Sequence, residues 1–80
     1  MKREILRTTK SRLAQMGIKI FQKDIDSVET IKRENVGNIM GWTKDTIRVT
    51  LKNGSSYTYI AEPTDIYSGA TSYKLIGIDW

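Results

Sequence analysis

Residues 37–61, GNIMGWTKDTIRVTLKNGSSYTYIA, decide the fold of this chain. Three apolar residues in this stretch alternate with polar ones, which is the period-2 pattern of a strand with one buried face: Ile47, Val49 and Leu51. The dipeptide Asn53-Gly54 follows, which is typical of a tight β-hairpin, and a second alternating run comes directly after it. The stretch therefore predicts two antiparallel strands joined by a short loop.

The length of that loop determines which side chains share a face. With a two-residue loop, the tyrosines of the second strand would face away from the aliphatic residues of the first. A three-residue loop that ends at Gly54 instead pairs Val49 with Tyr57 and Ile47 with Tyr59, which gathers the apolar side chains on one face. We therefore expect the longer loop, with Gly54 in the left-handed conformation of a type I turn followed by a G1 bulge.

The composition restricts the possible functions. A chain of 80 residues forms one small domain, residues 1–80, with a modest core. It has no cysteine and no histidine, which removes disulfides, thiolate ligands and the commonest general base. Its one close acid pair, Asp24 and Asp26, would point to different faces of a helix, and no phosphate-binding loop or nucleophile motif is present. We expect a non-catalytic protein with no metal and no cofactor.

The positive charge is concentrated in the N-terminal part of the chain. The net charge is +4, but residues 1–23 hold seven Lys or Arg side chains against one acid, Glu4, which is +6. This asymmetry favours an acidic partner, either nucleic acid or an acidic protein surface. No apolar run is long enough for a signal peptide or a membrane span, so we expect a cytoplasmic protein with no membrane partner.

Residues 3–16 have the periodicity of an amphipathic helix. Their apolar side chains recur at spacings of three and four, and Gly17 follows where a left-handed C-cap glycine would end the helix. Arg3, Arg7 and Lys10 line up beside the apolar stripe. This basic side is either simply solvated or a binding surface.

Residues 18–35 are compatible with a helix or a strand. Four apolar residues at helical spacing favour a second helix, which we prefer: Phe21, Ile25, Val28 and Ile31. A strand over 27–33 is the alternative, because β-branched residues are frequent there. A helix-turn-helix motif is disfavoured, because Gly17 comes one residue too early after Ala14 and the second helix would be acidic.

Residues 36–80 predict a β-meander after this basic helical segment of residues 1–35. We expect a first strand over 37–42, a polar turn at 43–45, and then the hairpin. Pro63 should end the third strand and open a short helical turn near 63–69. Residues 73–80 predict a last strand with one face made of Lys74, Ile76, Ile78 and Trp80. The expected class is α+β, an N-terminal helical segment packed on an antiparallel meander, with a small Sm-like or SH3-like barrel as the alternative.

The order of strand and turn residues in this meander also carries a family resemblance. The residues that carry it are Ile39, Gly41-Trp42, Ile47, Val49, Leu51, Asn53-Gly54, Tyr57-Thr58-Tyr59, Pro63, Ile66-Tyr67, Ala70 and Ser72. On these positions, residues 38–72 resemble the KTSC domain, a short module at the C-terminus of some lysyl-tRNA synthetases that also occurs alone in bacterial and phage proteins. Trp42-Thr43 departs from it, because the family has Tyr-Asp there. The resemblance implies a meander, and RNA binding has been proposed for the family.

We expect a small module that binds nucleic acid, with RNA favoured, through the basic helix and a polar sheet face. The expected phosphate contacts are Arg3, Arg7, Lys10, Arg12, Arg48 and Lys52. Tyr57 and Tyr59 could stack on bases, but sharing a face with three aliphatic residues favours a place in the core. The alternative function is a phage-type protein-binding inhibitor of a host enzyme or defence system, anchored by Trp42 or Trp80. A symmetric oligomer joined through an open strand edge is a third possibility.

Overall fold

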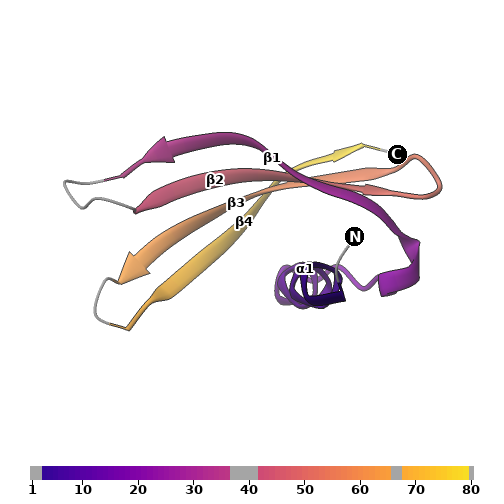
Figure 1. Ribbon diagram of the computed structural model, residues 1–80, viewed down its shortest axis with the longest axis horizontal. Coiled ribbons are helices and arrows are strands. Elements are labelled where there is room, and N and C mark those ends of the chain that lie inside the picture. Colours follow the sequence, from indigo (N-terminus) through magenta and orange to yellow (C-terminus); the bar gives the residue numbers. More distant parts are fainter. Residues whose placement is uncertain (1–2, 37–41, 66–67, 80) are drawn as a thin grey trace.

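The computed structural model describes residues 3–36, 42–65 and 68–79 of the chain. Its elements are helix α1 (Arg3–Gln15), a 3-10 turn η1 (Gln22–Asp24), and strands β1 (Ile25–Asn35), β2 (Thr43–Leu51), β3 (Ser56–Asp65) and β4 (Ala70–Asp79). The strands form one antiparallel sheet in the order β1-β2-β3-β4, with β1 and β4 as its edges (Figure 1). The predicted α+β class is confirmed, whereas the alternative of a closed barrel is wrong.

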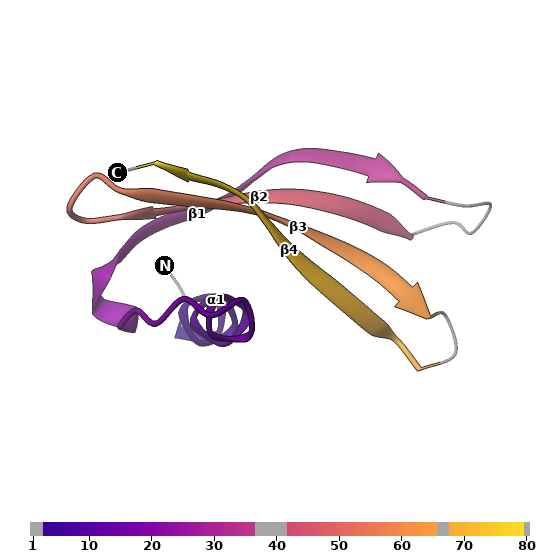
Figure 2. The same cartoon turned by 180° about the vertical axis from the view of Figure 1, so that it is seen from behind.

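Helix α1 packs against one face of the sheet, which we call the inner face, and leaves the outer face bare. The molecule is elongated, measuring 40 × 23 × 20 Å, because the strands run well past the helix at one end (Figures 1 and 2). At that end β1 and β3 finish and β2 and β4 begin. The inner face is therefore covered by α1 over only part of its length.

The hairpin between β2 and β3 has the register that the sequence predicts. Val49 pairs with Tyr57 and Ile47 with Tyr59, so all four side chains lie on the inner face. The backbone N–H of Leu51 donates to the carbonyl of Ser55 over 2.8 Å, which closes a three-residue loop. Gly54 in that loop has φ +93°, the left-handed conformation that favours glycine.

Helix α1 begins and ends close to the predicted residues, and its C-terminus is capped by Gly17. This glycine has φ +85° and its N–H donates to the carbonyl of Ala14 over 3.0 Å. The N–H of Ile18 donates to the carbonyl of Leu13 over 2.8 Å. These two bonds form a Schellman motif, which satisfies the last carbonyls of the helix and turns the chain back along it.

The preferred second helix over residues 18–35 is wrong, because most of this segment is strand β1. The alternative strand is the better prediction. Ile25 pairs with Leu51 and Val28 with Val49, and an extra residue between them, at Asp26, forms a bulge. A second bulge falls at Ile31. The bulge at Asp26 places Ile25 and Val28 on the same face although they are three positions apart, whereas Ile31 is itself an extra residue and is exposed. The apolar spacing of this strand therefore imitates that of a helix.

Two predicted turns are also wrong. Residues 43–45 belong to β2, and the strand expected over 37–42 lies mostly outside the described residues. Strand β3 continues through Pro63 to Asp65, where we expected a helical turn near 63–69. Pro63 lies beyond Ala61, the last residue of β3 that pairs with β2, so its missing N–H removes no bond between those strands. Residues 66 and 67 of that predicted turn are not described.

The predicted apolar face of the last strand is wrong as well, because β4 carries a bulge. Tyr59 pairs with Leu75 and Thr58 with Gly77, which leaves Ile76 as the extra residue. Leu75 and Ile78 consequently share the inner face, although one is odd-numbered and the other even-numbered. Trp80, also predicted for that face, lies outside the described residues.

The core lies between α1 and the middle of the inner face. Its fully buried side chains are Leu13 from the helix, Val49 from β2 and Tyr59 from β3. Burying a side chain such as Leu or Val stabilises a fold by about 1.5–3 kcal/mol. Ile18 and Ile20, from the segment after α1, pack against this core and close its side.

Candidate nucleic-acid interface

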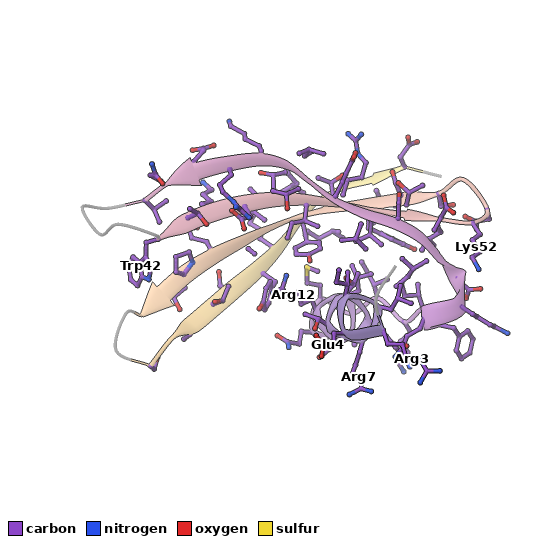
Figure 3. The ribbon with its side chains drawn as sticks, viewed as in Figure 1. Arg3, Glu4, Arg7, Arg12, Trp42 and Lys52 are labelled. Atoms are coloured by element: carbon purple, nitrogen blue, oxygen red, sulfur yellow. The ribbon has the colours of Figure 1, made fainter. Side chains whose placement is uncertain are left out.

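The two long sides of α1 carry basic residues in different surroundings. Lys10 and Arg12 are two positions apart, which is about 200° around a helix, so they lie on nearly opposite sides. Arg3 and Arg7 fall on the side of Lys10. Figure 3 shows Arg3 and Arg7 pointing away from the sheet, whereas Arg12 points toward the strands.

The first of these sides is an exposed basic surface. Arg3, Arg7 and Lys10 are all exposed to solvent, as the sequence predicts. Two further exposed lysines, Lys19 and Lys23, follow in the segment that turns back along α1. We call these five residues together the basic flank. None of them forms an ion pair with a carboxylate of the described residues.

The segment after Gly17 places an aromatic ring in the basic flank. Ile18 and Ile20 turn inward, so the alternating residues Lys19 and Phe21 turn outward. Phe21 is extended, with φ −94° and ψ 148°, and its side chain is 65 % exposed. The Lys23 ammonium nitrogen lies over this ring, 5.5 Å from its centroid. An aromatic ring is therefore exposed to solvent beside several cations.

A cavity of about 320 Å³ opens between α1 and this segment. We call it the Phe21 pocket. Its walls are mostly apolar, with two lysines among them: Lys10, Ala14, Ile18, Lys19, Ile20 and Phe21. Phe21, Lys19 and Lys23 are not among the site residues predicted from the sequence, because helical spacing places Phe21 on an apolar stripe. The local alternation Ile18-Lys19-Ile20-Phe21 is the signal that could have found them.

Arg12, also predicted as a phosphate contact, is not part of the exposed basic surface. Its side chain donates a hydrogen bond to the Tyr59 hydroxyl over 3.3 Å, and its guanidinium carbon lies 5.0 Å from the centroid of the Tyr73 ring. Its Nε is buried and has no hydrogen-bond partner among the described residues. Burial lowers the pKa of Arg12, but the interactions with Tyr59 and, to a smaller extent, with Tyr73 together outweigh it and raise this pKa above its ordinary value.

Beyond Arg12, the uncovered end of the inner face forms a polar cleft. Two cavities of about 290 Å³ and about 480 Å³ meet there, and Arg12 and Asp45 line both. Asp45 is already neutralised by Arg33, whose Nε lies 3.0 Å from its carboxylate. Trp42, predicted as a partner anchor, is half-buried and lines the smaller cavity.

The other predicted site residues are dispersed. Tyr59 is fully buried and Tyr57 nearly so, at 7 % exposure, which leaves no ring face for a base and corrects their assignment as nucleic-acid contacts. Arg48 is exposed on the outer face, opposite Thr58 in the neighbouring strand. Lys52 lies in the hairpin loop, where its backbone N–H donates to the carbonyl of Asp24 over 2.9 Å. The basic helix and the polar sheet face therefore lie on opposite sides of the sheet.

The part of the chain that the structure describes contains neither a cluster of possible metal ligands nor a membrane-spanning helix. No group of three acidic side chains there is close enough to hold a metal ion. No helix within the same residues has the length and apolar character needed to cross a membrane.

Comparisons with protein-family models, with curated proteins and with solved structures find no match to this chain. The assignment of a function therefore depends on the geometry alone.

Proposed function

We propose that this protein is a non-catalytic module that binds nucleic acid, with RNA favoured, through the basic flank. The observation that carries the proposal is the exposure of all five cations on one side of the molecule, with no carboxylate partner among the described residues. Glu4, the one acid among residues 1–23, lines the polar cleft on the other side of α1. An unpaired cluster of this kind is the usual electrostatic footprint of a phosphate-binding surface.

The KTSC resemblance belongs to the same proposal but concerns another part of the chain. It covers residues 38–72, whereas the basic flank lies within residues 3–23. A nucleic-acid site on α1 would therefore be additional to whatever the KTSC-like meander does. Arg48 lies on the outer face of the meander, so changing it tests whether nucleic acid binds to the sheet instead of to α1.

The test is a fluorescence-anisotropy titration of short RNA and DNA strands at several salt concentrations. Binding releases counterions, so the logarithm of affinity should fall linearly with the logarithm of salt concentration, with a slope of roughly −3.5 for five contacts on a single strand. Changing Arg3, Arg7 and Lys10 to Gln should make this slope shallower by roughly 2 and weaken all sequences alike.

A charge-matched control replaces three exposed cations that lie outside the basic flank: Lys32, Arg48 and Lys74, each to Gln. This variant loses the same charge, so it measures what long-range attraction alone contributes. An equal loss of affinity in both variants would contradict an interface on α1. A loss of affinity in the control variant alone would indicate that the interface lies on the sheet. If the wild-type protein binds neither RNA nor DNA at low salt, the proposal fails and a protein partner is favoured.

A further inference from the structure

The Phe21 pocket combines lysines with two features that a backbone-binding surface does not need. These are an aromatic ring that is 65 % exposed and apolar walls from Ala14 and two isoleucines in the same cavity. Among the large hydrophobic side chains of the described residues, Phe21 is the most exposed. Phosphate contacts alone require cations, not an exposed ring. The ring and the apolar cavity therefore call for a separate explanation.

We propose that the Phe21 pocket holds one unpaired nucleobase, which stacks on the Phe21 ring while neighbouring lysines contact the flanking phosphates. This inference rests on the proposed function and specifies its substrate as single-stranded nucleic acid. Every nucleobase has a flat π-face, so an exposed aromatic ring beside a positively charged groove binds single strands with little sequence preference.

The volume and charge of the cavity fit this occupant. About 320 Å³ lies at the small end of the range of ligand pockets, which suits one flat heterocycle and not a long peptide. A base in this cavity would have the side chains of Lys10 and Lys19 beside it, because both lysines line the cavity. Lys23 adds a third cation at the ring itself. An apolar cavity with only cations at its rim is complementary to a base that carries a phosphate on each side.

Duplex nucleic acid cannot use the pocket, because its bases are stacked on each other and paired. In a duplex, each base is available only after unstacking and unpairing, which opposes insertion. The basic flank can still contact the phosphates of a duplex. The pocket therefore predicts a preference for single strands at equal salt and an equal number of phosphates.

The experiment compares single-stranded RNA, single-stranded DNA and a blunt duplex, each labelled, with wild-type protein and variants of Phe21. Phe21→Ala and Phe21→Leu should both weaken single-strand binding by roughly 5- to 150-fold and leave duplex affinity and the salt slope unchanged. Phe21→Tyr should keep the wild-type affinity, since it keeps the ring. Phe21→Leu separates stacking from simple apolar contact, because leucine is apolar and has no π-face.

A second variant blocks the cavity and leaves the ring in place. Ala14 is exposed on α1 and lines the pocket, so Ala14→Leu should keep the helix and fill part of the space that the base needs. We expect it to weaken single-strand binding and to leave duplex binding unchanged. A urea-unfolding midpoint for each variant confirms that the fold is intact.

The outcomes distinguish this inference from the proposed function. If the wild type binds with the expected salt slope but Phe21→Ala has the wild-type affinity for single strands, the pocket does not hold a base and the backbone-binding function stands. If Phe21→Leu retains full affinity, the pocket contacts something apolar and stacking is wrong. If the wild type binds nothing at low salt, the proposed function and this inference fail together.

Discussion

The two sides of α1 use the same type of side chain in opposite ways. Arg7 extends into solvent on the basic flank, whereas Arg12, five residues later, is enclosed by two tyrosines of the sheet (Figure 3). The hydrogen bond to Tyr59 and the contact with the Tyr73 ring hold the Arg12 guanidinium in place. No such contact with a described residue holds Arg7, so its guanidinium can bind a partner without disturbing the fold.

The two arginines show that a count of positive charges in the sequence overestimates the number of cations available for binding. Residues 1–23 hold seven cations, and the structure places one of them, Arg12, against the core. An arginine in such a site supports the sheet through its flat guanidinium and its aliphatic stem. The useful criterion is whether a cation is exposed and unpaired. Arg3, Arg7, Lys10, Lys19 and Lys23 meet it.

The largest expected effect is that of removing Tyr59, whose hydroxyl accepts the hydrogen bond from Arg12. Tyr59→Ala should lower the free energy of unfolding by about 3–5 kcal/mol, because a fully buried aromatic side chain is lost and its cavity cannot collapse completely. Urea unfolding followed by circular dichroism measures it. The matched control is Phe21→Ala, which should cost less than about 1 kcal/mol because that ring is 65 % exposed. Equal losses from the two aromatic residues would contradict the assigned core.

The next effect compares the two arginines directly. Arg12→Ala should lower the free energy of unfolding by about 2 kcal/mol, since it removes a hydrogen bond from a charged donor and a cation–π contact. Arg7→Ala should change it by less than about 0.5 kcal/mol. The change in helix propensity is the same for both substitutions, so the difference between their free energies of unfolding measures the contribution of the Arg12 contacts.

Arg12→Lys separates the contribution of the positive charge of Arg12 from that of its planar guanidinium. Lysine keeps the charge but has a compact ammonium group in place of the planar guanidinium, so it should not restore the stability. Full recovery with lysine would show that Arg12 contributes through its charge alone, and the distinction between the two sides of α1 would lose its structural basis.

A smaller effect is expected at Gly17, where the chain turns from α1 toward Phe21. Gly17→Ala should cost about 1 kcal/mol, because the residue has φ +85° and an L side chain is strained there. An added Cβ would meet no atom within 4 Å, so the cost comes from the backbone conformation and not from a clash. Gly17→Asn should cost less, since asparagine tolerates this conformation. Thermal or urea unfolding distinguishes the two substitutions.

The hairpin could be predicted from the sequence because its residues satisfy two independent constraints. The apolar pattern of residues 47–59 and the position of Gly54 agree on one register, and the structure has that register. The helix α1 and its cap at Gly17 could be predicted for the same reason. In each case the local turn chemistry and the apolar period indicate the same structure.

Strands β1 and β4 could not be placed correctly, because bulges break the period on which the prediction depends. The extra residues at Asp26, Ile31 and Ile76 move the following side chains to the other face. Bulges are set by pairing between strands, and a single strand's sequence does not reveal them. Some residues of the candidate site could likewise be predicted from the sequence, and others could not. Arg3, Arg7 and Lys10 follow from helical spacing alone, whereas the environment of Arg12 depends on Tyr59 and Tyr73.

The smallest effect on stability is the one that separates the two sides of α1 most clearly. Arg7→Gln should leave the free energy of unfolding within about 0.5 kcal/mol of the wild type, because the side chain is exposed and unpaired. It should nevertheless make the slope of log affinity against log salt shallower by about 0.7, the share of one phosphate contact on a single strand.

Arg12→Gln should do the opposite on the same helix, with a clear loss of stability and an unchanged salt slope. Its charge lies against the sheet, and a phosphate on the basic flank would be on the far side of α1 from it. Anisotropy titrations and urea unfolding of these two variants measure both quantities. If Arg12→Gln also makes the slope shallower by the share of one contact, the polar cleft takes part in binding and the interface extends around the helix.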